Sequence, residues 1–246
     1  MKYYSLASGS KGNCFVVQTS QSIVVIDCGS TKKHLINSFS KIDINYTQVD
    51  ALLITHGHTD HVSQVKMFAD VLIFSPIPIN NGQGYQQVVP FMSFHVNELT
   101  ITPIPLSHDS EITVGYIIED AYEKLIYITD TGYIKNALIP LLKDAQYIIL
   151  ESNHDPEMLM NSRRPHGIKT RILSDNGHLS NDSCADVLGK IVSVHTKEIV
   201  LAHLSEEANS YILAYQASFD KLKSLGYLPL IKIAGQFEIV TGGLLP

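Results

Sequence analysis

Short apolar runs separated by polar turns recur along most of the chain. Eight of these runs are rich in β-branched and other apolar residues and are four to six residues long, as ordinary strands are. We expect strands at residues 14–19, 23–26, 51–54, 99–104, 114–118, 125–129, 147–150 and 199–202. They predict one or two β-sheets.

Three helices are expected between or after these runs. Residues 181–194 place apolar side chains on one helical face, with Ser180 as the expected N-cap. Residues 206–225 follow Ser205 and begin with two acidic residues, which a helix dipole favours in the first turn. A third helix is expected over residues 31–40. Strands joined by segments of helix length favour mixed α/β layers.

Side chains that bind metals stand where the expected strands end. The six residues of this kind are Asp27, His56, His108, Asp130, Glu151 and His203. One polar residue after one strand means little, because loops are polar. Six in one chain indicate a shared edge at which these strand ends converge.

The densest group of such side chains directly follows the expected strand at 51–54. His56, His58, Asp60 and His61 place three imidazoles and one carboxylate within six positions. Imidazole and carboxylate are ligands of borderline divalent metals, and four in one short segment exceed what one tetrahedral ion takes from it. The spacing therefore predicts a site for two metal ions.

Composition favours one folded domain. The 246 residues are 45% hydrophobic and 17% charged, which is ordinary for a globular protein able to bury a large core. No Pro-, Gly- or Ser-rich linker divides the chain, so we expect a single domain over residues 1–246. Residues 75–94 show no clear periodicity and are expected to form an irregular connection.

Charge and apolar content narrow the functional classes. The net charge of −6 argues against a protein that coats nucleic acid non-specifically, but leaves room for a local basic groove. No apolar signal core begins the chain, and no stretch reaches the roughly 20 residues of a membrane span. We therefore expect a cytoplasmic protein, in which Cys14, Cys28 and Cys184 are buried thiols.

The motif His-x-His-x-Asp-His after a strand, followed by an isolated His, an Asp and a late His, resembles the metallo-β-lactamase fold superfamily of hydrolases. The match spans most of the chain, and Asp27 falls where that superfamily has its early aspartate. Residues 8–13, 151–155, 177–181 and 201–205 also resemble its small bacterial YycJ-like branch. The resemblance implies an α/β fold, a four-layer αβ/βα sandwich of two mixed β-sheets flanked by helices, with two metal ions at one edge.

The same resemblance implies how the ligands divide between the two ions. The first ion would be held by His56, His58 and His108, the second by Asp60, His61 and His203, with Asp130 bridging both. Asp130 stands where secreted lactamases of the superfamily carry a cysteine, which disfavours antibiotic hydrolysis. His58 stands where flavo-diiron relatives carry a glutamate, which disfavours redox chemistry.

Two ions roughly 3.5 to 4 Å apart can share a water and lower its pKa towards about 7. We expect the resulting hydroxide to attack phosphorus while Asp60 orients it as a catalytic residue. A structural N-cap is the alternative role for Asp60, and the two roles can coexist.

Two residues are expected to hold the ligand side chains in place without binding a metal themselves. Asp27 would accept an imidazole N–H from a ligand such as His56 or His58 and so fix its ring. A turn-forming Asp before Gly29 is an equally good interpretation. Asn13 would buttress the site, or would only shape the glycine-rich turn around it.

His178 is the second candidate catalytic residue. Ser180 and the free N–H groups of the helix that follows it would form a phosphate-binding site. There His178 would protonate the leaving oxygen or bind the scissile phosphate. The resemblance favours this role, because other nucleases of the superfamily use an extra histidine in this way. Without the resemblance, the better interpretation of His178 is a histidine of a surface loop. His154 is a weaker candidate for the same pocket.

The chain has one markedly basic stretch. Arg163 and Arg164, with Lys169 and Arg171 nearby, are candidates to grip the flanking phosphates of a nucleic-acid strand. A solvated loop is the alternative, and both interpretations stay open.

The leading functional prediction is a binuclear metal-dependent hydrolase, a phosphodiesterase or nuclease, because the YycJ-like branch that the chain resembles is associated with 5′-end exonuclease action on DNA. DNA, RNA and small phosphodiesters all remain candidate substrates. The alternatives are a small-molecule ester, thioester or lactone hydrolase resembling glyoxalase II, and a non-catalytic metal-binding protein. Imidazole and carboxylate ligands suit Zn²⁺, Mn²⁺ and Fe alike. Nothing in the sequence indicates an oligomeric state.

Overall fold

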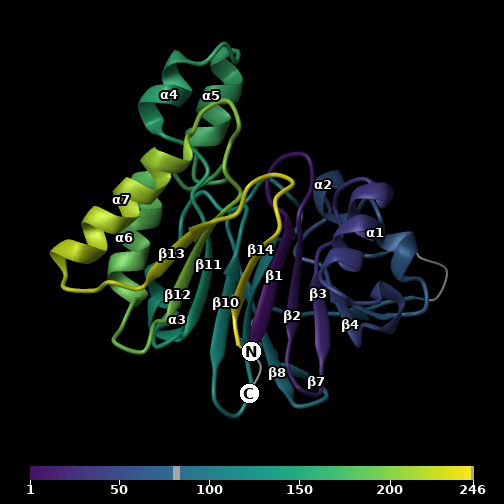
Figure 1. Ribbon diagram of the computed structural model, residues 1–246. Coiled ribbons are helices and arrows are strands. Elements are labelled where there is room, and N and C mark those ends of the chain that lie inside the picture. The colour runs from purple at the N-terminus through teal and green to yellow at the C-terminus, as the bar shows by residue number, and fades with distance from the viewer. Residues whose placement is uncertain (80–83, 245–246) are drawn as a thin grey trace.

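The computed structural model describes residues 1–79 and 84–244, and these residues form two β-sheets that face each other with helices outside (Figure 1). The first sheet has the strand order β14-β1-β2-β3-β4-β5-β6. Its strands are β1 (Lys2–Ala7), β2 (Cys14–Gln18), β3 (Ile23–Ile26), β4 (Ala51–Leu53), β5 (Leu72–Ser75), β6 (Gln86–Gln87) and β14 (Val240–Gly243). Pairing is antiparallel from β14 to β3 and parallel from β3 to β6, so this sheet is mixed.

The second sheet has the order β13-β12-β11-β10-β9-β8-β7 and is also mixed. Its strands are β7 (Phe94–Val96), β8 (Leu99–Pro105), β9 (Val114–Glu119), β10 (Lys124–Ile128), β11 (Tyr147–Glu151), β12 (Glu198–Ala202) and β13 (Leu230–Ile233). Pairing is antiparallel from β7 to β10 and parallel from β10 to β13. The expected pair of mixed sheets is therefore confirmed.

Helices cover the outer face of each sheet. They are α1 (Lys32–Lys41), α2 (Thr59–Val62), α3 (Ile139–Leu142), α4 (Pro156–Asn161), α5 (His166–Leu173), α6 (Asn181–Ile191) and α7 (Tyr211–Ser224), with short 3₁₀ turns at Tyr46–Gln48, Val65–Phe68 and Asn136–Leu138. In Figure 1, α1 and α2 lie beside the first sheet, α6 and α7 beside the second, and α4 and α5 stand at one end of the sandwich.

Alternate side chains of the strands fill different layers of the core. Tyr3 and Phe15 of the first sheet share one buried cluster with Tyr116 and Tyr147 of the second, which places that cluster between the sheets. The opposite faces pack on helices, for example Val25 of β3 in one cluster with Leu35 of α1. Because both faces are covered, the inner strands are apolar throughout, as the run at 23–26 shows.

The second helix predicted near the C-terminal end begins later than expected. Its N-cap is Ser210, whose side chain accepts from the N–H of Leu213, so the prediction of a start after Ser205 was wrong. The Ser205 hydroxyl accepts from the N–H of Ala208 and closes a turn instead. The two acidic residues therefore lie in that turn and not in the helix.

The connection at 75–94 starts at the last residue of β5 and ends at the first residue of β7, and among its other described residues only the two of β6 are regular. Residues 80–83 of that segment are outside the described residues. β6 and β7, like the edge strands β13 and β14, are short or partly exposed, so their sequences carry weak alternation.

Strand register brings the polar strand ends to one edge. Glu151 pairs with Ala202, so the ends of β11 and β12 are level, and the N–H of Asp27 after β3 donates to the carbonyl of Leu53 at the end of β4. Asp27, Asp130 and His203 all have positive φ, at 58°, 58° and 55°. Such backbone is unfavourable for residues other than glycine and concentrates at functional sites, so the chain turns sharply where these side chains must point into the edge.

Candidate metal centre

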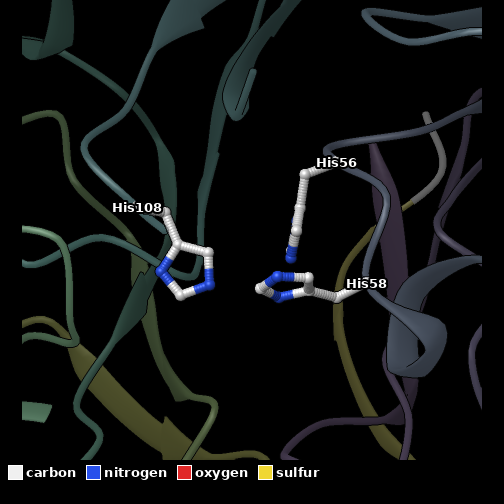
Figure 2. A group of neighbouring side chains, drawn as sticks. All are labelled: His56, His58 and His108. Atoms are coloured by element: carbon white, nitrogen blue, oxygen red, sulfur yellow. The ribbon is translucent and has the colours of Figure 1, made fainter. Parts of the chain in front are cut away.

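Three imidazoles from two segments form the first group of ligands. His56 and His58 lie in the loop between β4 and α2, and His108 lies in the loop after β8. Figure 2 shows the three rings turned toward one another, and each offers a nitrogen within 4.8 Å of the other two. Burial lowers the pKa of the His56 imidazole, so this ring is neutral, as a metal ligand must be.

The second group consists of Asp60, His61 and His203, again with donor atoms within 4.8 Å of one another. Asp60 lies in the first turn of α2, whose N-cap is His58, so the alternative role of Asp60 as the N-cap is wrong. His203 comes from the end of β12 in the opposite sheet. The group therefore joins residues from both halves of the sandwich.

Asp130 lies between the two groups. Its Oδ2 is 3.1 Å from Nε2 of His61, while its Oδ1 is 3.5 Å from Nε2 of His203 and 3.8 Å from Nε2 of His108. One carboxylate thus reaches ligands of both groups, which is the arrangement that a bridging role requires.

Several buried atoms here that could bind a metal make no hydrogen bond within the protein. Among the described residues, His56 Nε2, His203 Nε2 and Asp130 Oδ2 are buried without a hydrogen bond. A buried polar atom without a partner costs about 1–3 kcal/mol, so such atoms are rare outside functional sites. Imidazole nitrogens and a carboxylate oxygen that converge in this way fit divalent metal ions.

The partners of three ring nitrogens indicate which atom each histidine keeps for a metal. His61 donates from Nδ1 to Asp27 at 2.7 Å, His203 from Nδ1 to Glu151 at 2.8 Å, and His108 from Nδ1 to the carbonyl of Gly177 at 3.2 Å. When the ring is neutral, as a metal ligand must be, the lone pair of each is then on Nε2, which lies within 3.8 Å of Asp130 in all three.

Asp27 and Asn13 support the second group, as the sequence suggested, but through a different ring. Asp27 accepts from His61, and from the backbone N–H and hydroxyl of Thr55 at 2.9 and 2.8 Å, so its partner is neither His56 nor His58. The Asn13 amide nitrogen lies 2.9 Å from Nε2 of His61. Both side chains hold His61 in place.

Glu151 is the functional residue that the site prediction missed. Its Oε1 accepts from Nδ1 of His178 and Nδ1 of His203, both at 2.8 Å, and its Oε2 accepts from the backbone N–H groups of Thr131 and Leu179. Although burial raises the pKa of a carboxyl group, these histidines lower that of Glu151 to about 2. The available signal was its position at the end of β11. The other metal-binding residue types that follow the expected strands, Asp27, His56, His108, Asp130 and His203, all reach the site.

The centre attracts positive charge. Although burial opposes the charged form of each, Asp130 and Glu151 raise the pKa of His203 to about 9, and His203 and His61 hold the pKa of Asp130 well below its usual range. In the metal-free protein, protonation of His203 therefore supplies the positive charge that a bound metal ion would otherwise supply.

His178 lies at the open side of the centre with 20% of its side chain exposed. It lines a small pocket of about 60 Å³ together with Ser10, Asn153, Arg164, His203 and other residues. Arg164 is held there by Glu207, at 2.6 Å, and lies 3.5 Å from the Ser205 hydroxyl.

The other substrate candidates are less well placed. His154 is only 1% exposed, so in this conformation it has no surface to offer a substrate. The Ser180 hydroxyl caps α6 through the N–H of Ser183, which confirms its N-cap role. Arg163 is exposed, between α4 and α5. The three cysteines are free and buried, as expected.

An αβ/βα sandwich whose histidines and carboxylates converge at one edge defines a metal-binding protein of the lactamase fold class. Residues 23–204 match the family known as the Beta-lactamase superfamily domain, and the chain belongs to this family. In the part of the chain that the structure describes, no helix is long and apolar enough to cross a membrane.

Relatives extend the likeness over nearly the whole chain. The exodeoxyribonuclease YycJ of Bacillus anthracis is 32% identical over 235 residues, covering 90% of this chain and 89% of that protein. The exodeoxyribonuclease WalJ of Streptococcus pneumoniae is 31% identical over 239 residues, covering 90% and 88%. The metallo-β-lactamase fold protein YhfI of Bacillus subtilis has the same fold, with a TM-score of 0.73 at 15% identity over 98% of this chain and all of that one.

Proposed function

We propose that this protein is a binuclear metal-dependent phosphodiesterase that degrades nucleic acid from a strand end, with DNA as its main substrate. The observation that carries the proposal is the position of Asp130, whose carboxylate lies within 3.8 Å of His108 of the first group and of His61 and His203 of the second. Two relatives over 30% identical carry the name exodeoxyribonuclease, which supports nucleic acid as the substrate class.

Bound divalent ions would supply a water of lowered pKa and neutralise charge on the phosphate. His56, His58 and His108 would hold one ion, Asp60, His61 and His203 the other, and Asp130 both. Zn²⁺, Mn²⁺ and Fe²⁺ all suit these donors, so loading experiments should include each.

The protein's own groups complete the reaction. His178 donates its Nδ1 hydrogen to Glu151, which leaves Nε2 free to face a substrate. A protonated His178 would give that proton to the leaving oxygen, while Glu151 stabilises the positive charge of the ring. The partly exposed carboxylate of Asp60 would accept a hydrogen bond from the attacking group and orient it.

Substrate contacts are proposed for the pocket beside His178. Arg164 is the best placed of the basic residues, because it lines that pocket with Asn153. Arg163 would contact phosphates further along the strand. An acidic protein that binds a polyanion needs such a local basic surface, since its net charge of −6 opposes the encounter.

A gel time course on end-labelled single- and double-stranded DNA and RNA tests the proposal. Metal-loaded native protein should shorten DNA stepwise from the 5′ end. Asp60→Ala should lower the rate at least about 100-fold while remaining folded. Asp220→Asn, which changes an exposed acid on α7, is the control and should keep the native rate. Lack of cleavage with all three metals, or native activity in Asp60→Ala, would contradict the proposal.

A further inference from the structure

Asp109 lies beside the first ligand group although no motif singles it out. Its Oδ1 is 3.3 Å from Nε2 of His108 and 3.9 Å from Nε2 of His58. The Asp109 side chain is 27% exposed, so it stands at the open side of the site. The carboxylate thus shares one corner of the edge with two of the three imidazoles.

The atoms that meet at this corner carry lone pairs. Since Nδ1 of His108 donates to the carbonyl of Gly177, Nε2 of that ring is unprotonated in the neutral form. The nearby Asp109 Oδ1 is also a lone-pair atom, so positive charge, from a metal ion or from a proton on Nε2, fits between the two. Two donors about 2.1 Å from one tetrahedral ion are about 3.4 Å apart, close to the separation found here.

Arg171 of α5 fixes the direction of this carboxylate. Its guanidinium pairs with Oδ2 of Asp109 through both Nε and Nη2. The bonds lock one carboxylate oxygen and leave Oδ1 turned toward His108. A further hydrogen bond of 2.9 Å, from the Ser107 hydroxyl to the Asn176 side chain, joins the loop after β8 to the turn after α5.

We propose that Asp109 is an additional ligand of the ion held by His56, His58 and His108, and that Arg171 is its positioning residue. The inference rests on the proposed function, because it needs a metal at that group. With Asp109 in place, each ion has a carboxylate of its own, Asp109 or Asp60, besides the shared Asp130. Oxygen ligands suit Mn²⁺ better than thiolates or imidazoles alone do, so Asp109 raises the manganese affinity of this position.

Metal binding measured without turnover tests the inference. Chelator-treated protein is titrated with Mn²⁺, and free Mn²⁺ is followed by electron paramagnetic resonance. Native protein should bind two ions. Asp109→Asn should bind one of them at least about tenfold more weakly, the lower end of what the loss of a supporting partner costs. The visible spectrum of the Co²⁺-loaded variant should also change, because one ligand is missing.

Two controls separate the possible causes. Asp220→Asn makes the same charge change far out on α7 and should bind as the native protein does. Arg171→Gln keeps the carboxylate and should keep both ions, with a smaller loss of affinity than Asp109→Asn. Native Mn²⁺ affinity and an unchanged Co²⁺ spectrum in Asp109→Asn would overturn the inference, as would equal losses in Asp109→Asn and Arg171→Gln. Native protein that binds no ion would contradict the proposed function itself.

Discussion

Four N–H groups converge on Glu151, and this number decides what can replace it. Two come from His178 and His203, and two from the backbone of Thr131 and Leu179. A carboxylate accepts on both oxygens, whereas an amide must turn its NH₂ toward two of these donors. The site therefore needs a charged Glu here, and not merely a side chain of its shape.

Glu151→Gln should lower metal affinity about 10- to 100-fold, because it disturbs the ring of a ligand, His203. It should also slow turnover, because His178 loses the partner that stabilises its charge. Metal content after dialysis and the rate on labelled DNA measure the two effects. Glu119→Gln on β9 removes a partly exposed carboxylate away from the site and is the control. Native metal content in Glu151→Gln would show that the carboxylate does not position His203.

At this scale the sequence predicted residue types better than contacts. The cluster of His and Asp at positions 56–61 was recognisable because metal binding explains it, whereas packing and solubility do not require it. The choice of His61 as the partner of Asp27 depends on ring directions that arise only when β3 and β4 are paired. Asp109 was invisible for the same reason, since its meeting with Arg171 joins positions 62 residues apart.

The turn between β3 and α1 holds α2 in place by direct backbone contact. A Cβ on Gly29 would lie 1.5 Å from the carbonyl oxygen of Asp60. The Cys28 N–H donates to the carbonyl of His61, and the Asn13 N–H to that of Asp60, both at 2.8 Å. Three backbone segments are thus stacked without side chains between them, and this contact sets where the second ligand group stands.

Gly29→Ala should destabilise the protein by about 3 kcal/mol, because the backbone of α2 must move away. It should also weaken metal binding through Asp60 and His61. Gly167→Ala is the matched control, since a Cβ there meets nothing within 4 Å and alanine favours its helix by up to about 1 kcal/mol. Urea unfolding and Mn²⁺ titration of both variants give the comparison. Equal stabilities of Gly29→Ala and Gly167→Ala would show that the backbone around Gly29 can move apart at little cost in free energy.

Most inner strands were predicted, because they are apolar on both faces. Those with an expected run matched it within two residues, as β3 and β12 show. The inner strands β1 and β5 had no expected run, although both are largely buried. Edge strands such as β13 have half-exposed residues, and β6 has only two. The late start of α7 was missed because Ser205 and Ser210 offer equal N-cap chemistry, and only the contacts of the intervening turn distinguish them.

At the scale of the whole molecule, the candidate metal centre joins the two sheets. The ligands at positions 56–61 follow β4 of the first sheet, whereas His108, Asp130 and His203 follow β8, β10 and β12 of the second. An ion bound by both sets needs both sheets packed in their native positions. The unfolded chain cannot offer these donors together, so metal binding and the packing of the sandwich are linked.

Metal removal should therefore lower the melting temperature of the native protein. An ion present at 1,000 times its Kd stabilises the folded state by about 4 kcal/mol, which corresponds to about 8–16 °C for a chain of this size. Melting curves with chelator and with saturating Mn²⁺ measure the shift. Asp130→Asn removes the carboxylate that reaches both groups, so the difference between its chelated and Mn²⁺-saturated melting temperatures should be smaller than in the native protein. Its chelated form should melt below the chelated native protein, because His203 and His61 lose a buried charge partner. If chelator leaves the native melting temperature unchanged, the two halves are held by apolar packing alone and the ions do not join them.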